Sequence, residues 1–129
     1  MESKIMKKVL VVQDDKLNGG LNVQLLEEYE VLTANDGIEA LQMARKHTPD
    51  FVLMDMSLPV MDGWEATRRF KIDEKLRAIP IIALIAHDMR DGEEKARGFG
   101  CDGYLAKPID ADLLLEKLKS FLEDRNTLA

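Results

Sequence analysis

The sequence predicts a doubly wound α/β domain, in which five parallel strands form one sheet that is wrapped by helices on both faces. Short apolar runs without polar alternation occur at 9–12, 51–54, 81–85 and 103–106, and such runs are typical of strands buried on both faces. Segments with helical periodicity lie between them, which is the pattern of βα units that pair in parallel. A chain of 129 residues is long enough for one such domain.

Two helices are expected in the first half of the chain. The first should begin near Gly20, where paired glycines weaken helix formation by about 1 kcal/mol each relative to alanine. The next should begin at 36–39, where Asp36 and Glu39 resemble an acidic capping box. Its apolar side should combine residues three and four apart in sequence, namely Ile38, Leu41 and Ala44 or Ala40.

Two helices are expected between the later strands, and one follows the last strand. Asp62 can cap a helix over about 63–72. A polar helix is predicted over 88–99, where nearby glycines suit helix termination. Asp110 can cap the last helix, and its apolar stripe is expected to contain Leu113, Leu114, Leu118, Phe121 and Leu122.

Polar residues that could carry chemistry follow the buried runs. Asp55 ends the run at 51–54, and ligands of open α/β sheets bind beyond the carboxyl ends of the strands. An isolated aspartate at such a place more often caps a turn. The other runs are followed by Gln13, Asp14 and Asp15, by Ala86, His87 and Asp88, and by Lys107. We therefore expect several carboxylates and one lysine to converge at one edge of the sheet.

The order of these residues resembles that of a known family. Asp14 follows the first run, Asp55 lies within Leu-Met-Asp-Met-Ser-Leu-Pro at 53–59, a Met-Asp-Gly turn occupies 61–63, and proline follows Lys107. From residue 8 to 122 the chain is similar to the receiver domains of two-component response regulators, in particular to chemotaxis-regulator-like single-domain receivers. The resemblance implies the flavodoxin-like (βα)5 fold with strand order 2-1-3-4-5. It also implies one receiver domain over 1–129, with short tails outside the core 8–122.

The resemblance implies a signalling role. Asp55 would accept a phosphoryl group from a histidine kinase or a histidine phosphotransfer protein, and Lys107 would meet the phosphate. Such a domain is not an enzyme beyond slow autodephosphorylation, and it passes a conformational change to a downstream protein effector. The residues implied at the rim of the phosphorylation site are Ser57, Ala86 and His87. Ile85 and Tyr104 stand at the two switch positions.

A magnesium ion is the expected cofactor, because it prefers oxygen ligands and offsets the charge of a carboxylate close to a phosphoryl group. By resemblance its ligands would be the side chains of Asp14 and Asp55 and the backbone carbonyl of Ser57. The position before Asp14, which is usually acidic in receivers, is Gln13. An amide could still contact the ion through a water molecule, but it brings no charge, so we expect reduced affinity for Mg²⁺.

Ile85 is a second departure from the family pattern, since receivers usually carry threonine or serine there. Isoleucine has no hydroxyl to bond a phosphoryl oxygen, and its β-branched side chain is stiff and larger than threonine. The sequence is also compatible with Ile85 being one more core residue that extends the strand. Together with Gln13, Ile85 leaves open a pseudo-receiver, a binding module with weak or no phosphorylation-dependent switching.

Two alternative functions from other classes agree less well with the sequence. A haloacid-dehalogenase-type phosphatase needs a second aspartate two residues after its nucleophile, where this chain has Ser57. A flavodoxin-type carrier of flavin mononucleotide needs a hydroxyl and a glycine-rich phosphate loop after the first strand. The acidic pair Asp14 and Asp15 would repel phosphate there without a metal.

Composition limits the location and the partners. No apolar stretch approaches the ~20 residues of a membrane-spanning helix, and no secretory signal is evident, so we expect no membrane insertion and a cytoplasmic location. The net charge of −6 argues against direct nucleic-acid binding, which depends on basic side chains that neutralise phosphates. Cys101, the one cysteine, is expected to be a small buried residue near a turn.

Overall fold

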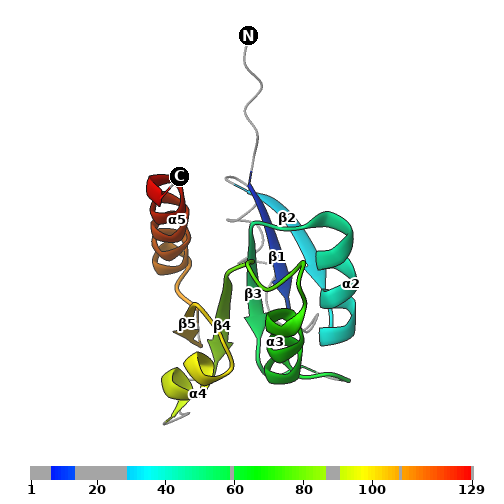
Figure 1. Ribbon diagram of the computed structural model, residues 1–129. Helices are drawn as coiled ribbons and strands as arrows, with labels where there is room; N and C mark the ends of the chain where they lie inside the picture. The colour runs from blue at the N-terminus through cyan, green and yellow to red at the C-terminus, as the bar shows by residue number, and fades with distance from the viewer. Residues whose placement is uncertain (1–6, 14–28, 59, 87–90, 108, 129) are drawn as a thin grey trace.

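The computed structural model describes residues 7–13, 29–58, 60–86, 91–107 and 109–128, with the backbone only for 111 and 121–128 (Figure 1). The helix expected near Gly20 and the side chains of Asp14 and His87 lie outside these ranges. The side chains of Phe121 and Leu122 are likewise not described. No helix in the described part of the chain is both long and apolar enough to cross a membrane.

Five parallel strands form one sheet. They are β1 (Lys8–Val12), β2 (Glu30–Ala34), β3 (Phe51–Asp55), β4 (Ile81–Ile85) and β5 (Gly103–Ala106). Their order is β2-β1-β3-β4-β5, and every neighbouring pair is parallel. The fold class and strand order predicted from the sequence are therefore confirmed. β2 lies on one side of β1 and β3 lies on the other, so the strand order reverses between β1 and β3.

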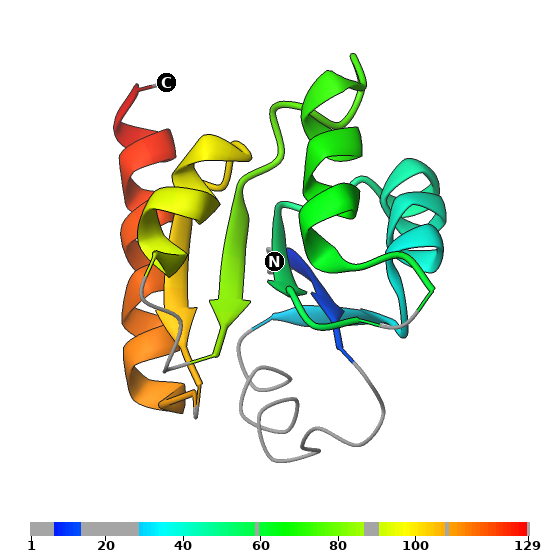
Figure 2. The same ribbon diagram turned by 90° about the horizontal axis from the view of Figure 1, so that it is seen from below.

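The described helices cover both faces of the sheet. The elements are α2 (Gly37–His47), α3 (Gly63–Ile72), α4 (Gly92–Gly98) and α5 (Ala111–Leu128). Ala44 of α2, Phe70 of α3 and Ala96 of α4 are buried in one core cluster, whereas Leu114 and Leu118 of α5 belong to a second. Both views draw α5 on the opposite side of the molecule from α2 (Figures 1 and 2). The strands supply alternate residues to the two clusters, as a sheet covered on both faces requires.

Aspartate side chains cap three of the helices, as their positions predict. Asp36 Oδ1 accepts from Glu39 N at 2.8 Å, and Glu39 reaches back to the backbone of Asn35 at 2.6 Å. Asp62 Oδ1 accepts from Glu65 N at 2.9 Å. At the start of α5, the carboxylate of Asp110 accepts two backbone N–H groups, those of Asp112 and Leu113. These bonds satisfy donors that have no partner inside the helix.

Three details of the predicted helices are wrong. In the described part of the chain the polar helix begins at Gly92, because Asp91 lies outside the helix and makes no side-chain capping bond. Ile38 is exposed, since the buried stripe of α2 consists of Gly37, Ala40, Leu41 and Ala44, to which Ile38 is not aligned. Leu113 is exposed as well, because α5 turns Leu114 and Leu118 toward the sheet.

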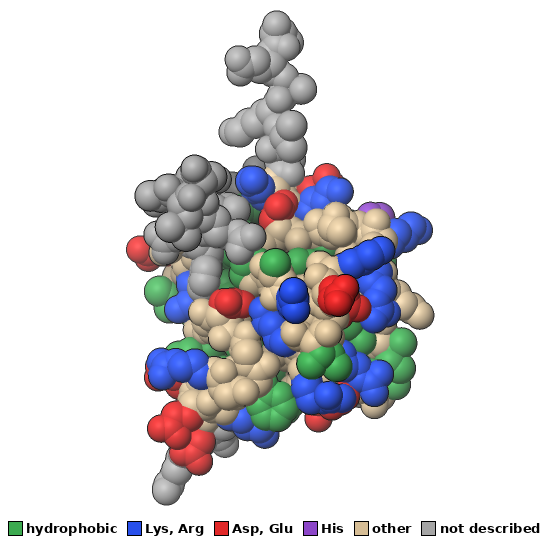
Figure 3. Space-filling model, in the orientation of Figure 1, with side chains coloured by type: hydrophobic (Ala, Val, Ile, Leu, Met, Phe, Trp, Pro, Cys, Tyr) green, Lys and Arg blue, Asp and Glu red, His purple; other side chains and the backbone are tan. Residues whose placement is uncertain are grey.

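Charged side chains of both signs are interspersed on the molecular surface (Figure 3). Many form local pairs, for example Glu65 with Arg68 and Arg69 on the same helix. Hydrogen bonds from these two arginines lower the pKa of Glu65 to about 2. Such exposed pairs add little to stability, because water and salt screen them.

Candidate functional site

Asp55 ends β3 at the edge of the sheet where the strand order reverses. It pairs in register with Leu84 of β4, and Gln13 follows the end of the neighbouring strand β1. Open α/β sheets bind ligands at this place, beyond the carboxyl ends of the strands where the strand order reverses. Asp55 has 0% of its surface exposed. A carboxylate buried to this degree needs a charged or hydrogen-bonding partner.

Lys107 supplies that partner. Its Nζ lies 2.7 Å from Asp55 Oδ1, and its side chain is 27% exposed. The backbone N–H of Lys107 donates to Ile85 O at 2.8 Å, one step beyond the last register pair of β4 and β5. Pairing of the strands therefore places Lys107 beside Asp55, although the two are far apart in sequence. The predicted convergence of these two residues is observed.

The two oxygens of Asp55 have different surroundings. Oδ1 accepts from Lys107 and from the backbone N–H of Ser57 at 2.9 Å. Oδ2 is buried and has no hydrogen-bond partner among the described residues. Buried polar atoms are normally satisfied, and a carboxylate oxygen is a ligand that Mg²⁺ accepts. Asp55 therefore fits a magnesium site. Among the described residues, Ser57 after β3 and Gln13 after β1 are the other candidates for contact with the ion.

Two glycines bring helices close to the loop that follows Asp55. The N–H of Gly63 donates to Met56 O at 3.3 Å, and that of Gly37 donates to Met61 O at 3.1 Å. A Cβ atom on Gly63 would lie 2.5 Å from Asp55 O, and one on Gly37 would lie 2.7 Å from Met61 O. Sequence reasoning noticed Gly63 as part of a turn but missed this close approach. Both glycines permit the contacts that hold the loop in place.

Val60 is another residue of this loop that the sequence did not single out. Its φ is 65°, in the left-handed region, and 82% of the residue's surface is exposed. A β-branched residue is strained by about 1–2 kcal/mol in that conformation. The strain lies in the connection between Asp55 and α3, so the loop conformation is imposed by its surroundings rather than by local preference.

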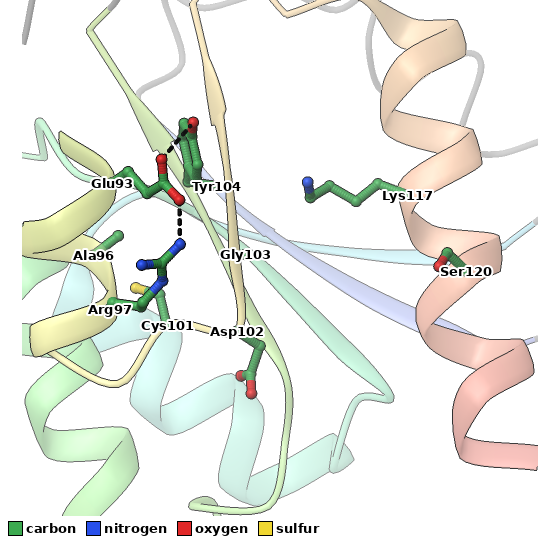
Figure 4. Close-up of a pocket in the computed structure, with 9 residues that line it drawn as sticks. All are labelled: Glu93, Ala96, Arg97, Cys101, Asp102, Gly103, Tyr104, Lys117 and Ser120. Carbon is green, nitrogen blue, oxygen red and sulfur yellow. Dashed lines mark hydrogen bonds and ion pairs between the residues drawn. The ribbon is translucent and has the colours of Figure 1, made fainter.

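The predicted switch residues lie on the same face of the sheet. Tyr104 pairs with Ala83, and Ile85 pairs with Ala106, which makes Tyr104 and Ile85 diagonal neighbours. Ile85 is buried and Tyr104 is half-buried against the same core cluster. The phenol of Tyr104 donates to Glu93 Oε1 of α4 at 3.2 Å (Figure 4). Sequence reasoning did not connect Tyr104 with Glu93.

Two further predicted positions can be placed only in part. Ala86 is half-buried directly after β4, and its place at the rim of the site stays a prediction, while His87 is outside the described residues. Cys101 is buried between α4 and β5, as predicted, and burial raises the pKa of its thiol to about 11. The thiol therefore stays protonated near neutral pH, where it is a poor nucleophile.

Comparison with known proteins gives the family. The sequence model of the response regulator receiver domain family matches residues 9–119 of this chain. The chain belongs to this family. A curated relative of this receiver domain, the polar-differentiation response regulator DivK of Brucella ovis, is 44% identical over 120 residues. The match covers 92% of this chain and 98% of DivK.

Solved structures agree with this receiver domain in fold. The chemotaxis response regulator CheY4 of Vibrio cholerae is 30% identical with a TM-score of 0.81, and the match covers 90% of this chain and 98% of that one. The receiver domain of the sensor histidine kinase PA1611 of Pseudomonas aeruginosa is 35% identical with a TM-score of 0.79, over 90% of this chain and 97% of that one. The latter structure is described with a magnesium ion coordinated in its active site cleft.

Proposed function

We propose that this receiver domain accepts a phosphoryl group on Asp55 from a phosphohistidine of a histidine kinase or histidine phosphotransfer protein. The observation that carries the proposal is the buried carboxylate of Asp55, with Lys107 on one oxygen and no described partner on the other. A carboxylate that only capped a turn would not require a lysine from a distant strand. The domain then passes a conformational change to a downstream protein effector.

In the proposed transfer, an oxygen of Asp55 forms a bond to phosphorus. The bond between phosphorus and the donor imidazole nitrogen breaks, and its electron pair stays on that nitrogen. The ammonium of Lys107 offsets negative charge as the phosphoryl group approaches the carboxylate. The N–H of Ser57 holds Oδ1 and with it the orientation of the Asp55 side chain. All these groups stand ready before the donor arrives.

Mg²⁺ fits the oxygen donors that this site offers. Asp55 and the backbone carbonyl of Ser57 would hold it together with Asp14, which lies outside the described residues, and Gln13 would contact it through water. When bound, the ion supplies positive charge between the carboxylate and the phosphoryl oxygens. The domain carries out no further catalysis in this proposal apart from slow loss of its own phosphoryl group. The domain would act in the cytoplasm, where it would contact the kinase and the effector.

The test of Asp55 is phosphorylation with a small phosphodonor and Mg²⁺, followed by intact-mass measurement. The wild-type protein should gain one phosphoryl group, and Asp55→Asn should gain none, because an amide is not a nucleophile of this kind. Asp62→Asn is the matched control, since asparagine also caps helices and Asp62 lies in the adjacent connection. Labelling of Asp55→Asn at the wild-type level would refute the assignment.

A second prediction concerns the metal. Gln13→Asp should bind Mg²⁺ more tightly than the wild type by about tenfold, because one more carboxylate near the ion corresponds to roughly 1.4 kcal/mol of added attraction. Calorimetric titration measures both affinities. Gln42→Asp is the control, because it adds the same charge on the exposed surface of α2. Equal affinities of wild type and Gln13→Asp would show that residue 13 is not near the ion.

A pseudo-receiver, which binds partners without switching on phosphorylation, is a second candidate. The observation in its favour is Ile85, a buried apolar residue diagonal to Tyr104 where a hydroxyl would be needed. If Ile85 obstructs the switch, Ile85→Thr should show larger NMR shift changes at Tyr104 and α4 when a phosphate mimic and Mg²⁺ are added. An equally large response of the wild type would remove the support for this candidate.

A further inference from the structure

We propose that Glu93 of α4 is a latch for Tyr104. Its carboxylate holds the Tyr104 ring against α4, and release of this bond is the local event that changes the surface formed by α4 and β5. The inference deepens the proposed function and rests on it only for the link between the latch and Asp55. The position of Tyr104 in the resting protein is a property of Glu93 itself.

The first observation is how the two carboxylate oxygens of Glu93 are divided. Oε1 accepts the hydrogen bond of the Tyr104 phenol at 3.2 Å. Oε2 is paired with the guanidinium of Arg97, one helical turn further along α4. Figure 4 shows Glu93 between these two partners. The pairing with Arg97 restricts the carboxylate, so that its other oxygen is presented to Tyr104.

The second observation concerns how α4 is held. Lys95 Nζ lies 4.4 Å from the centroid of the Trp64 ring of α3, and the Trp64 and Phe99 ring centroids are 5.3 Å apart. Ala96 is buried in the core on the same helix. The position of α4 is therefore fixed independently of Tyr104, and Glu93 is presented from a docked helix. A contact between a docked helix and a strand can restrain the strand's side chain.

The third observation is the surroundings of the Tyr104 ring. A cavity of about 340 Å³ lies between α4, β5 and α5, and Glu93, Tyr104 and Lys117 are among its lining residues. Lys117 Nζ is 5.9 Å from the ring centroid and extends from α5 toward it (Figure 4). Movement of the ring would alter the shape of this cavity and the contact between the ring and Lys117. The latch therefore controls a feature of the molecular surface.

The side chain at residue 85 offers the Tyr104 phenol no alternative hydrogen bond. Isoleucine there has no donor or acceptor, so it contacts Tyr104 only through packing and cannot hold the phenol by a hydrogen bond. Among the described residues the phenol is bonded to Glu93. The side chain of Glu93 is 47% exposed, and a hydrogen bond at such a place is weak enough to break when the balance between two states shifts slightly.

The test uses the full chain labelled with 3-fluorotyrosine and fluorine NMR. The sequence has two tyrosines, so Tyr104→Phe assigns the signals. Glu93→Ala should move the Tyr104 signal and raise the population of a second ring position about fivefold, as expected for loss of one ordinary hydrogen bond. Glu93→Gln keeps one acceptor oxygen but loses the charge that pairs with Arg97, so its Tyr104 signal should lie between those of the wild type and Glu93→Ala. Glu94→Ala, which removes the neighbouring exposed carboxylate of α4, should leave the Tyr104 signal in place.

The outcomes separate the latch from the proposed function. An unchanged Tyr104 signal in Glu93→Ala would overturn the latch, and so would a shift of the Tyr104 signal in Glu94→Ala as large as that in Glu93→Ala. Addition of a phosphate mimic with Mg²⁺ should move the Tyr104 signal in the wild type and move it less in Glu93→Ala, which is already released. If the mimic moves neither protein while Glu93→Ala still differs from the wild type, the latch is supported and phosphorylation-dependent signalling is not.

Discussion

Gly63→Ala is expected to lower the free energy of unfolding by about 3 kcal/mol, which corresponds to a fall of about 10 °C in Tm. The added methyl group would lie 2.5 Å from Asp55 O, 2.6 Å from Met56 Sδ and 2.7 Å from Met56 Cα. Two of these atoms belong to the backbone of the strand end, which cannot rotate away as a flexible side chain can. Either α3 or the end of β3 must move to relieve the overlap.

The same substitution should reduce phosphorylation of Asp55, because the end of β3 sets the place of its carboxylate. We expect the rate with a small phosphodonor to fall at least tenfold at a temperature where the variant is folded. Gly98→Ala is the matched control, since nothing lies within 4 Å of a Cβ atom at that helical position. It should leave phosphorylation unchanged and stability equal or slightly higher. A Gly63→Ala protein as stable and as active as Gly98→Ala would contradict the close approach described for Gly63.

The sheet was largely predictable because its strands are buried on both faces. In β1, β3 and β4 the residues buried on both faces of the sheet are consecutive and almost all apolar. Such runs can be recognised in a sequence. The edge strand β2 is different, since Glu30 and Thr33 are exposed and only Ala34 is buried. The alternation of strands and helices predicted a strand between the first two helices. Its residues could not be identified from the sequence, because they do not form an apolar run.

The pair at the centre of the site was predictable for a topological reason. The carboxyl ends of parallel strands lie at one edge, so polar residues that end β3 and β5 must come near each other. That argument brings Asp55 and Lys107 together without any knowledge of side-chain conformation. It cannot reveal that Tyr104 bonds Glu93, because that contact depends on how a helix and a ring are turned toward each other.

The exposed positions of Ile38 and Leu113 have a similar cause. Helical spacing identifies a set of apolar residues, but which part of the set faces the sheet depends on how the helix is rotated about its axis. In α2 the contact of Gly37 with the loop at Met61 fixes the rotation, and Ile38 is turned outward. In α5 the rotation buries Leu114 and Leu118 instead of Leu113.

Lys71→Met is expected to lower the free energy of unfolding by about 2 kcal/mol and Tm by about 7 °C. Lys71 Nζ donates to Arg77 O at 3.3 Å, to Ile79 O at 3.1 Å and to Asp102 Oδ2 at 3.2 Å. The same Asp102 oxygen accepts from Ile81 N at 2.8 Å. One ammonium therefore joins the end of α3, the start of β4 and the turn before β5.

Methionine is the informative replacement because it keeps the apolar stem of lysine and removes the ammonium. Gly100, which has a φ of 99°, lies directly against that stem, since a Cβ atom on Gly100 would be 2.8 Å from Lys71 Cγ. The packing is therefore retained while three acceptors lose their common donor. Hydrogen exchange should become faster at the N–H groups of Ile81 and Asp102, which bond within this junction. Lys75→Met, on the exposed connection between α3 and β4, is the control and should change Tm by less than about 2 °C. If both variants melt alike, the ammonium of Lys71 contributes no more than a solvated surface lysine, and the junction must be held by the bond between Asp102 and Ile81 alone.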